Sequence, residues 1–125
     1  MDENGLSKEI LGAAIEVHQF LGPGLLERTY ELALAHELEV RGLKVETQVP
    51  VSMQYKALEI DSAYRIDILV NDLVVIEVKA VEKLLSIHSS QLLTYLRLKH
   101  KKLGLLLNFH MESMRDGIKR VVNNL

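Results

Sequence analysis

Three ionisable residues interrupt an apolar stretch in the middle of the chain, and their types are suited to chemistry. Asp67, Glu77 and Lys79 lie within residues 64–79, where most other positions are Val, Ile or Leu. A charge in such a segment is costly unless it is paired or binds a metal. Two carboxylates on adjacent strands can chelate Mg²⁺, and a nearby lysine can orient a water or stabilise charge on a phosphate. The combination favours metal-dependent hydrolysis of phosphodiesters.

The spacing of these residues indicates a β-hairpin that brings them together. Asn71 and Asp72 form a turn between two runs rich in β-branched residues. If Val70 pairs with Val74 across a three-residue loop, charged and apolar side chains separate almost completely onto two faces. One face carries Arg65, Asp67, Leu69, Val75, Glu77 and Lys79, and the other carries Tyr64, Ile66, Ile68, Val70, Val74, Ile76 and Val78. A two-residue loop would mix these sets, because a one-residue slip turns every side chain to the other face.

In the favoured register, Asp67 lies opposite Glu77 and Arg65 lies opposite Lys79. Two carboxylates and a lysine then converge on one spot, as a phosphodiesterase site requires. The alternative is that Lys79 and Glu77 only neutralise each other beside Asp67 at a half-exposed sheet edge. The pattern of residues alone leaves both interpretations open.

A predicted helix from about Ser86 to Lys101 supplies further polar groups. Gln91 and Tyr95 are four residues apart and share one face of it, and His88 precedes Gln91 by three. Their alternative roles are structural: Tyr95 as an amphipathic core residue, Gln91 as a surface residue and His88 at the helix N-terminus.

A second predicted helix, from about Leu25 to Arg41, begins with Gly24-Leu-Leu-Glu27-Arg-Thr-Tyr30. Glu27 lies in its first turn, where a carboxylate complements the helix dipole. It could instead be a third acidic metal ligand that projects toward the hairpin carboxylates. Tyr30, three residues later, is expected on the same face.

The remaining chain predicts helices around a small sheet. The expected elements are a loose terminus (1–6), a helix capped by Ser7 that runs to about Phe20, strands 43–49 and 51–55, a turn region 56–62, the hairpin, the helix of residues 86–101, a buried strand 103–109, a loop 110–117 and a short strand, or alternatively a helix, at 118–122. Pro50, between the first two strands, indicates an edge position or a bend. The helix after the hairpin is a crossover, so the buried strand can run parallel to its neighbour. This is a mixed α/β layer.

The composition and charge of the chain exclude or disfavour several kinds of site and protein. The 125 residues, without linker or repeat, predict a single domain over 1–125. The absence of Cys excludes disulfides and Cys-based zinc sites, and it suits a reducing, cytoplasmic compartment. No signal peptide or membrane span is expected. The net charge of −2 argues against tight duplex binding by bulk charge.

A basic cluster ends the helix of residues 86–101 and consists of Arg97, Lys99, His100, Lys101 and Lys102. Such a cluster is more typical of a solvated helix end than of a surface that binds phosphates.

Four motifs along the chain together resemble the GxxExxY proteins, a family assigned to the PD-(D/E)XK nuclease superfamily. They are, in order, Gly24-x-x-Glu27-x-x-Tyr30, Asp67 with Glu77-x-Lys79, His88-x-x-Gln91-x-x-x-Tyr95-Leu96, and Gly104-Leu-Leu-Leu-Asn108-Phe109. The resemblance spans about residues 10–122. One position departs from the superfamily pattern, since Ile66 stands where a Pro is expected before the first Asp.

The resemblance implies a restriction-endonuclease-like α/β fold with an α-β-β-β-α-β core, in which a small mixed sheet is flanked by helices. It also implies a phosphodiesterase site that uses Mg²⁺ or Mn²⁺. Asp67, Glu77 and Lys79 match the catalytic triad. Asp67, Glu77 and the main-chain carbonyl of Val78 would bind the metal, with Glu27 assisting.

Gln91 and Tyr95 resemble the Gln-x-x-x-Tyr signature of RecB-like nucleases, which lies near the catalytic centre and the DNA strand. The expected partner is therefore nucleic acid, DNA rather than RNA. A catalytically inactive nucleic-acid- or protein-binding module with the same fold is the alternative, and the slight acidity of the chain favours it. A homodimer through the second helix or an edge strand is left open by the sequence.

Overall fold

The structure is a computed structural model that describes all residues, 1–125. Five strands form one sheet in the order β1-β2-β3-β4-β5. The elements are α1 (Glu3–Leu21), α2 (Glu27–Val40), β1 (Val45–Tyr55), β2 (Leu58–Val70), β3 (Val74–Lys79), α3 (Ser86–Lys99), β4 (Leu103–Asn108), the 3₁₀ helix η1 (Met114–Gly117) and β5 (Ile118–Val122). β3 and β4 are parallel and the other neighbouring strands are antiparallel. This confirms the predicted α/β fold, a small mixed sheet flanked by helices.

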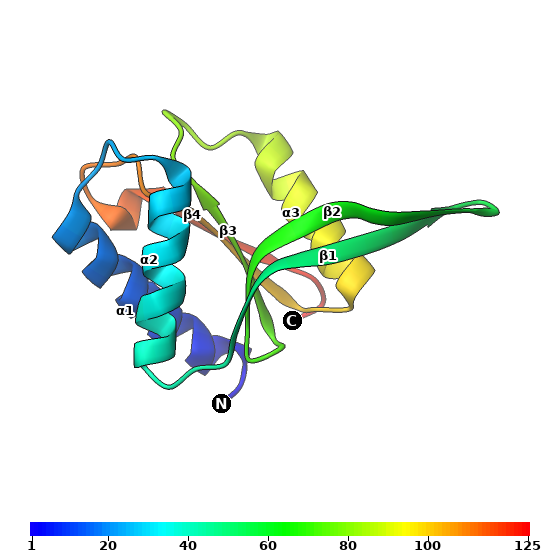
Figure 1. Cartoon of the computed structure of the whole chain (residues 1–125), viewed down its shortest axis with the longest axis horizontal. Helices are drawn as coiled ribbons and strands as arrows, with labels where there is room; N and C mark the ends of the chain where they lie inside the picture. The colour runs from blue at the N-terminus through cyan, green and yellow to red at the C-terminus, as the bar shows by residue number, and fades with distance from the viewer.

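Helices cover both faces of the sheet, and the two resulting cores differ in size (Figure 1). Buried side chains of α1 and α2 join those of the central strands in a cluster of 19 residues. On the other face, α3 covers a cluster of 8 buried residues. As predicted, α3 is the crossover that makes β4 parallel to β3. No helix has the length and apolar composition needed to cross a bilayer.

The N-terminal segment differs from the prediction of a loose terminus over residues 1–6 and a helix capped by Ser7. Helix α1 begins at Glu3, and the side chain of Asp2 accepts a hydrogen bond of 2.8 Å from the amide of Gly5. Leu6 is fully buried and Ser7 is 5% exposed. The terminus is helical because Leu6 adds apolar area to the core and Asp2 satisfies a free amide of the first turn.

Strands β1 and β2 form a long two-stranded ribbon that projects beyond the body of the protein (Figure 1). Pro50 lies on an edge strand, as predicted, but it does not divide β1, because the missing amide costs no ladder hydrogen bond at an edge. The prediction of a turn over residues 56–62 is wrong for residues 58–62, which belong to β2. Of these, residues 58–60 pair with β1 after a register shift between Val51 and Met53.

The predicted register of the central hairpin is confirmed. Val70 pairs with Val74 across a three-residue turn, and Ile68 pairs with Ile76. Asn71 and Asp72 adopt positive φ angles of 51° and 55°, which these residues tolerate better than most. The predicted strands 103–109 and 118–122 are also found, with β4 ending one residue early.

The predicted alternation of the hairpin faces reverses on the N-terminal side of Ile68. Ile68 lies in the core under α1 and α2, as expected, but Ile66 lies in the core under α3, and Tyr64 contacts Tyr95 on that same side. The reversal occurs opposite Gln48 of β1, whose φ of 52° interrupts the extended backbone. The prediction that Arg65 lies opposite Lys79 is wrong, because pairing between β2 and β3 ends at Ile68 and Ile76. Arg65 pairs with Pro50 of β1.

Candidate active site

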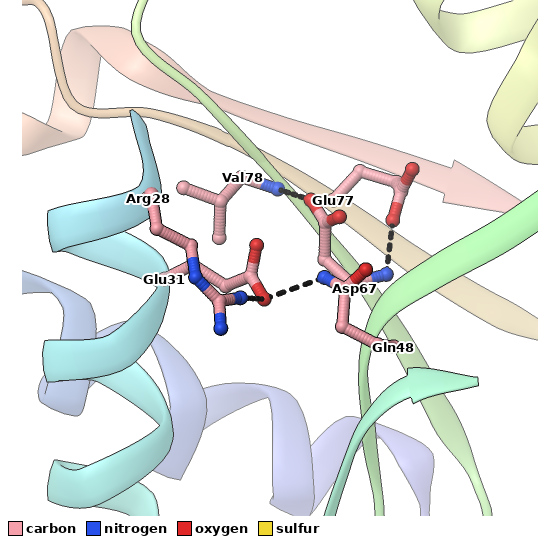
Figure 2. A network of polar contacts seen from close by, with 6 residues as sticks. All are labelled: Arg28, Glu31, Gln48, Asp67, Glu77 and Val78. Atoms are coloured by element: carbon pink, nitrogen blue, oxygen red, sulfur yellow. Dashed lines mark hydrogen bonds and ion pairs between the residues drawn. The ribbon is translucent and has the colours of Figure 1, made fainter. Parts of the chain in front are cut away.

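The two strands of the central hairpin separate where its two carboxylates lie. Backbone pairing ends at Ile68 and Ile76, and side chains continue the contact beyond that point. The amide of Asp67 donates to Glu77 Oε2 at 2.8 Å, and the amide of Val78 donates to Asp67 Oδ2 at 2.9 Å (Figure 2). Asp67 and Glu77 thus lie together, as the sequence predicted, and each leaves a second carboxylate oxygen free of these bonds.

Burial makes both carboxylates unusually hard to ionise. Glu77 is 7% exposed. Its burial, followed by the charge of Asp67, raises the pKa of Glu77 to about 8. Burial is also the main cause that raises the pKa of Asp67 to about 6, and the charges of Glu31 and Glu27 add to it. Near neutral pH the pair therefore retains about one proton, which a bound cation would displace.

Lys79 supplies positive charge beside this pair. It is half-buried at the end of β3, and its charge lowers the pKa of both Asp67 and Glu77. No ion pair within 4.0 Å joins Lys79 to either carboxylate. The alternative of a simple Lys79–Glu77 ion pair is therefore not the arrangement found.

Asp67 opens into a wholly polar cleft of about 590 Å³ between the N-terminal half of α2 and the β1–β2 ribbon. Its lining residues are Glu27, Arg28, Glu31, Gln48, Arg65 and Asp67. Glu27 is exposed in the first turn of α2, and it lines the cleft together with Arg28 and Glu31 of the same helix. Glu77, whose carboxylate accepts from the amide of Asp67, does not itself line the cleft.

A hydrogen-bonded network in the cleft was not predicted from the sequence. Glu31 is 5% exposed and accepts from Arg28 Nη1 at 2.7 Å and from Gln48 Nε2 at 2.6 Å (Figure 2). The position of Glu31, one helical turn after Glu27, was a signal that could have identified it. Gln48 gave no such signal, because only the left-handed backbone at this residue brings β1 to the cleft.

Tyr30 has a structural role distinct from that of Glu27. It is fully buried, and its ring stacks on Phe109 with centroids 4.7 Å apart. Its hydroxyl donates to the carbonyl of Gly22 at 2.5 Å and accepts from the amide of Leu25 at 3.1 Å. Tyr30 thus holds the loop before α2, whereas Glu27 faces the cleft, so the expectation that the two share one face is wrong.

Tyr95 and Gln91 of α3, predicted to share one helix face, differ in how far they are exposed. Tyr95 is 9% exposed in the smaller core, and burial followed by the charge of Glu77 raises its pKa. Tyr95 packs in one cluster with Ile66, the residue that precedes Asp67 on β2. Gln91, one turn earlier, is exposed. His88 has the structural role that the sequence favoured, since its Nδ1 accepts from the amide of Leu85 at the start of α3.

The donor set fits a hard cation bound through few protein ligands. No group of three or more His, Cys, Asp or Glu side chains is close enough to enclose an ion. Mg²⁺ is usually held by one or two carboxylates and several waters. Asp67 and Glu77 supply such a pair of oxygen donors beside an open cleft.

Comparisons with known proteins identify the group to which this architecture is similar. The family model of the PD-(D/E)XK nuclease superfamily matches residues 4–121. No curated protein and no solved structure matches the chain. The matched region contains the hairpin, the cleft and α3.

Proposed function

This chain belongs to the PD-(D/E)XK nuclease superfamily, and we propose that it hydrolyses phosphodiester bonds of nucleic acid with the help of Mg²⁺ or Mn²⁺. The observation that carries the proposal is the opened hairpin, where the buried Glu77 and the half-buried Asp67 each accept a hydrogen bond from the backbone of the other strand, next to Lys79. DNA is the proposed substrate in preference to RNA.

The metal site would consist of Asp67, Glu77 and the main-chain carbonyl of Val78, with Glu27 assisting from the cleft wall. A bound divalent ion supplies Lewis acidity and a water of lowered pKa. Glu77, which holds its proton near neutral pH without metal, must lose that proton to become a ligand. Metal binding is therefore expected to release protons.

The chain's own residues would then position the reacting groups. Lys79 holds the attacking water and stabilises the negative charge that develops on the phosphate. Gln91 and Tyr95 guide the substrate strand along α3. Gln91 is exposed and offers the open contact to a strand, whereas Tyr95 is 9% exposed and offers only its small accessible part.

The proposal is tested by cleavage of single-stranded and duplex DNA in Mn²⁺. We expect Lys79→Ala and Asp67→Ala each to lower the cleavage rate by a factor of about 100 or more. Lys56→Ala and Asp61→Ala are matched controls, because both residues are exposed on the ribbon, and they should retain the native rate. Cleavage that persists in Lys79→Ala and Asp67→Ala would remove the assignment.

A non-catalytic binding module is the second candidate, favoured by the absence of a three-residue metal cluster. Melting curves with and without Mn²⁺ separate the two. A nuclease that binds Mn²⁺ at 100 times its Kd should gain about 2.7 kcal/mol, and Asp67→Ala should lose most of that gain. Unchanged melting of the native protein would favour the module.

A further inference from the structure

Tyr64 is an exposed aromatic residue beside the site that the proposed reaction does not use. We infer that its ring is a platform on which an unpaired base stacks, so that the site selects single-stranded over duplex nucleic acid. The inference rests on the proposed function and adds its substrate class. Tyr64 lies on β2 three residues before Asp67.

The ring of Tyr64 packs against another aromatic ring and is also partly exposed to solvent. Its centroid lies 5.4 Å from that of Tyr95, and the two planes are tilted by 48°. Tyr64 is 37% exposed, whereas Tyr95 is 9% exposed and belongs to the core under α3. An aromatic ring fixed on one side and exposed on the other can stack a base without further ordering of the side chain.

The next residue along the strand offers a contact for the phosphate. Arg65 is exposed, lines the cleft together with Asp67, and forms no ion pair. The other cleft arginine, Arg28, is already bound to Glu31. Neighbouring residues of a strand point to opposite faces, so Tyr64 lies on the α3 side with Tyr95, and Arg65 and Asp67 lie on the cleft side. The base platform and the free cation therefore flank the open end of the hairpin from its two sides.

The charge distribution disfavours a duplex. Three of the six cleft residues are acidic and two are basic, so the cleft does not supply the many cationic phosphate contacts on which duplex affinity depends. The basic cluster of residues 97–102 adjoins the start of β4, while the site lies at the far end of its parallel neighbour β3. Lys101 in that cluster is bound to Asp72. Stacking on an aromatic ring depends less on charge.

The test is fluorescence anisotropy with a labelled oligothymidylate of about 15 nucleotides and its duplex, with Ca²⁺ in place of Mn²⁺. We expect the single strand to bind more tightly than the duplex. Tyr64→Ala should weaken single-strand binding about 5- to 150-fold, and Tyr64→Phe should restore it. Tyr55→Ala is the matched control, because Tyr55 is 59% exposed on the ribbon, and it should bind as the native protein does.

Intrinsic fluorescence gives an independent measurement. The chain has no Trp and four Tyr, so base stacking on Tyr64 should quench tyrosine emission, and Tyr64→Phe should reduce the quench while binding persists. Equal affinity for single strand and duplex, or native binding by Tyr64→Ala, would overturn the inference. Both readouts measure binding, so a protein that cleaves nothing but shows the Tyr64 effects would contradict only the nuclease proposal.

Discussion

The two ends of the β2–β3 hairpin are built from the same two strands and behave oppositely. At the closed end, Val70 pairs with Val74, and both side chains are fully buried in the larger core. At the open end, the carboxylates of Asp67 and Glu77 accept hydrogen bonds from backbone amides. The closed end satisfies its amides with backbone carbonyls, and the open end satisfies them with ionisable groups.

This difference shows how a small sheet can hold ionisable carboxylates at the edge of a polar cleft. Because the strands separate at Asp67, its side chain can reach the backbone of β3 and also line a polar cleft. The cost is that burial makes both carboxyl groups harder to ionise, which raises the pKa values of Asp67 and Glu77. The closed end has no such cost, and its contribution is purely to stability.

The largest expected effect comes from neutralising the open end. The pKa of Glu77 rises from 4.5 to about 8 on folding, so the native protein loses stability as the pH rises through this range. Glu77→Gln removes that loss, with a ceiling of about 5 kcal/mol above pH 8. Urea unfolding at several pH values should show the variant gaining about 2–5 kcal/mol over the native protein at alkaline pH, and little at pH 4. A constant difference across the range would contradict the buried-carboxylate account.

A core substitution in the paired part of the hairpin should lower the stability of the protein. Ile76 is fully buried and pairs with Ile68. Ile76→Val deletes one buried methylene and should lower the free energy of unfolding by about 0.5–1.5 kcal/mol at every pH. Cleavage per folded molecule should not change, because Ile76 faces the core under α1 and α2. A large loss of rate in this variant would show that the two ends are mechanically coupled.

The smallest expected effect is a change in the pKa of Asp67 when a charge in the cleft is removed. The charge of Glu31 raises the pKa of Asp67, so Glu31→Gln should lower that pKa. NMR titration of the side-chain carboxyl carbon of Asp67 measures this directly. The loss of the ion pair with the exposed Arg28 should cost less than about 1 kcal/mol. Glu9→Gln, which removes a carboxylate paired with Arg41 elsewhere on the surface, should leave the titration of Asp67 unchanged.

Local patterns in the sequence determined most of the hairpin and much of the fold. The alternation of Val and Ile around Asn71-Asp72 specified the register, since only one register buries the apolar set. The same pattern predicted that Asp67 and Glu77 lie side by side, and their hydrogen bonds across the hairpin confirm it. The crossover helix and the buried strand after it followed from periodicity and from the absence of charge.

Only the tertiary structure decided how the site is enclosed. The face reversal between Ile66 and Ile68 coincides with the left-handed backbone of Gln48, which lies between the residues of β1 that pair with Ile68 and Ile66. The burial that raises the pKa of Glu77, the Glu31 network and the contact of Tyr64 with Tyr95 likewise join segments far apart in the chain. Strand patterns report which residues share a face over a few positions, but twist and burial arise only when separate elements are packed together.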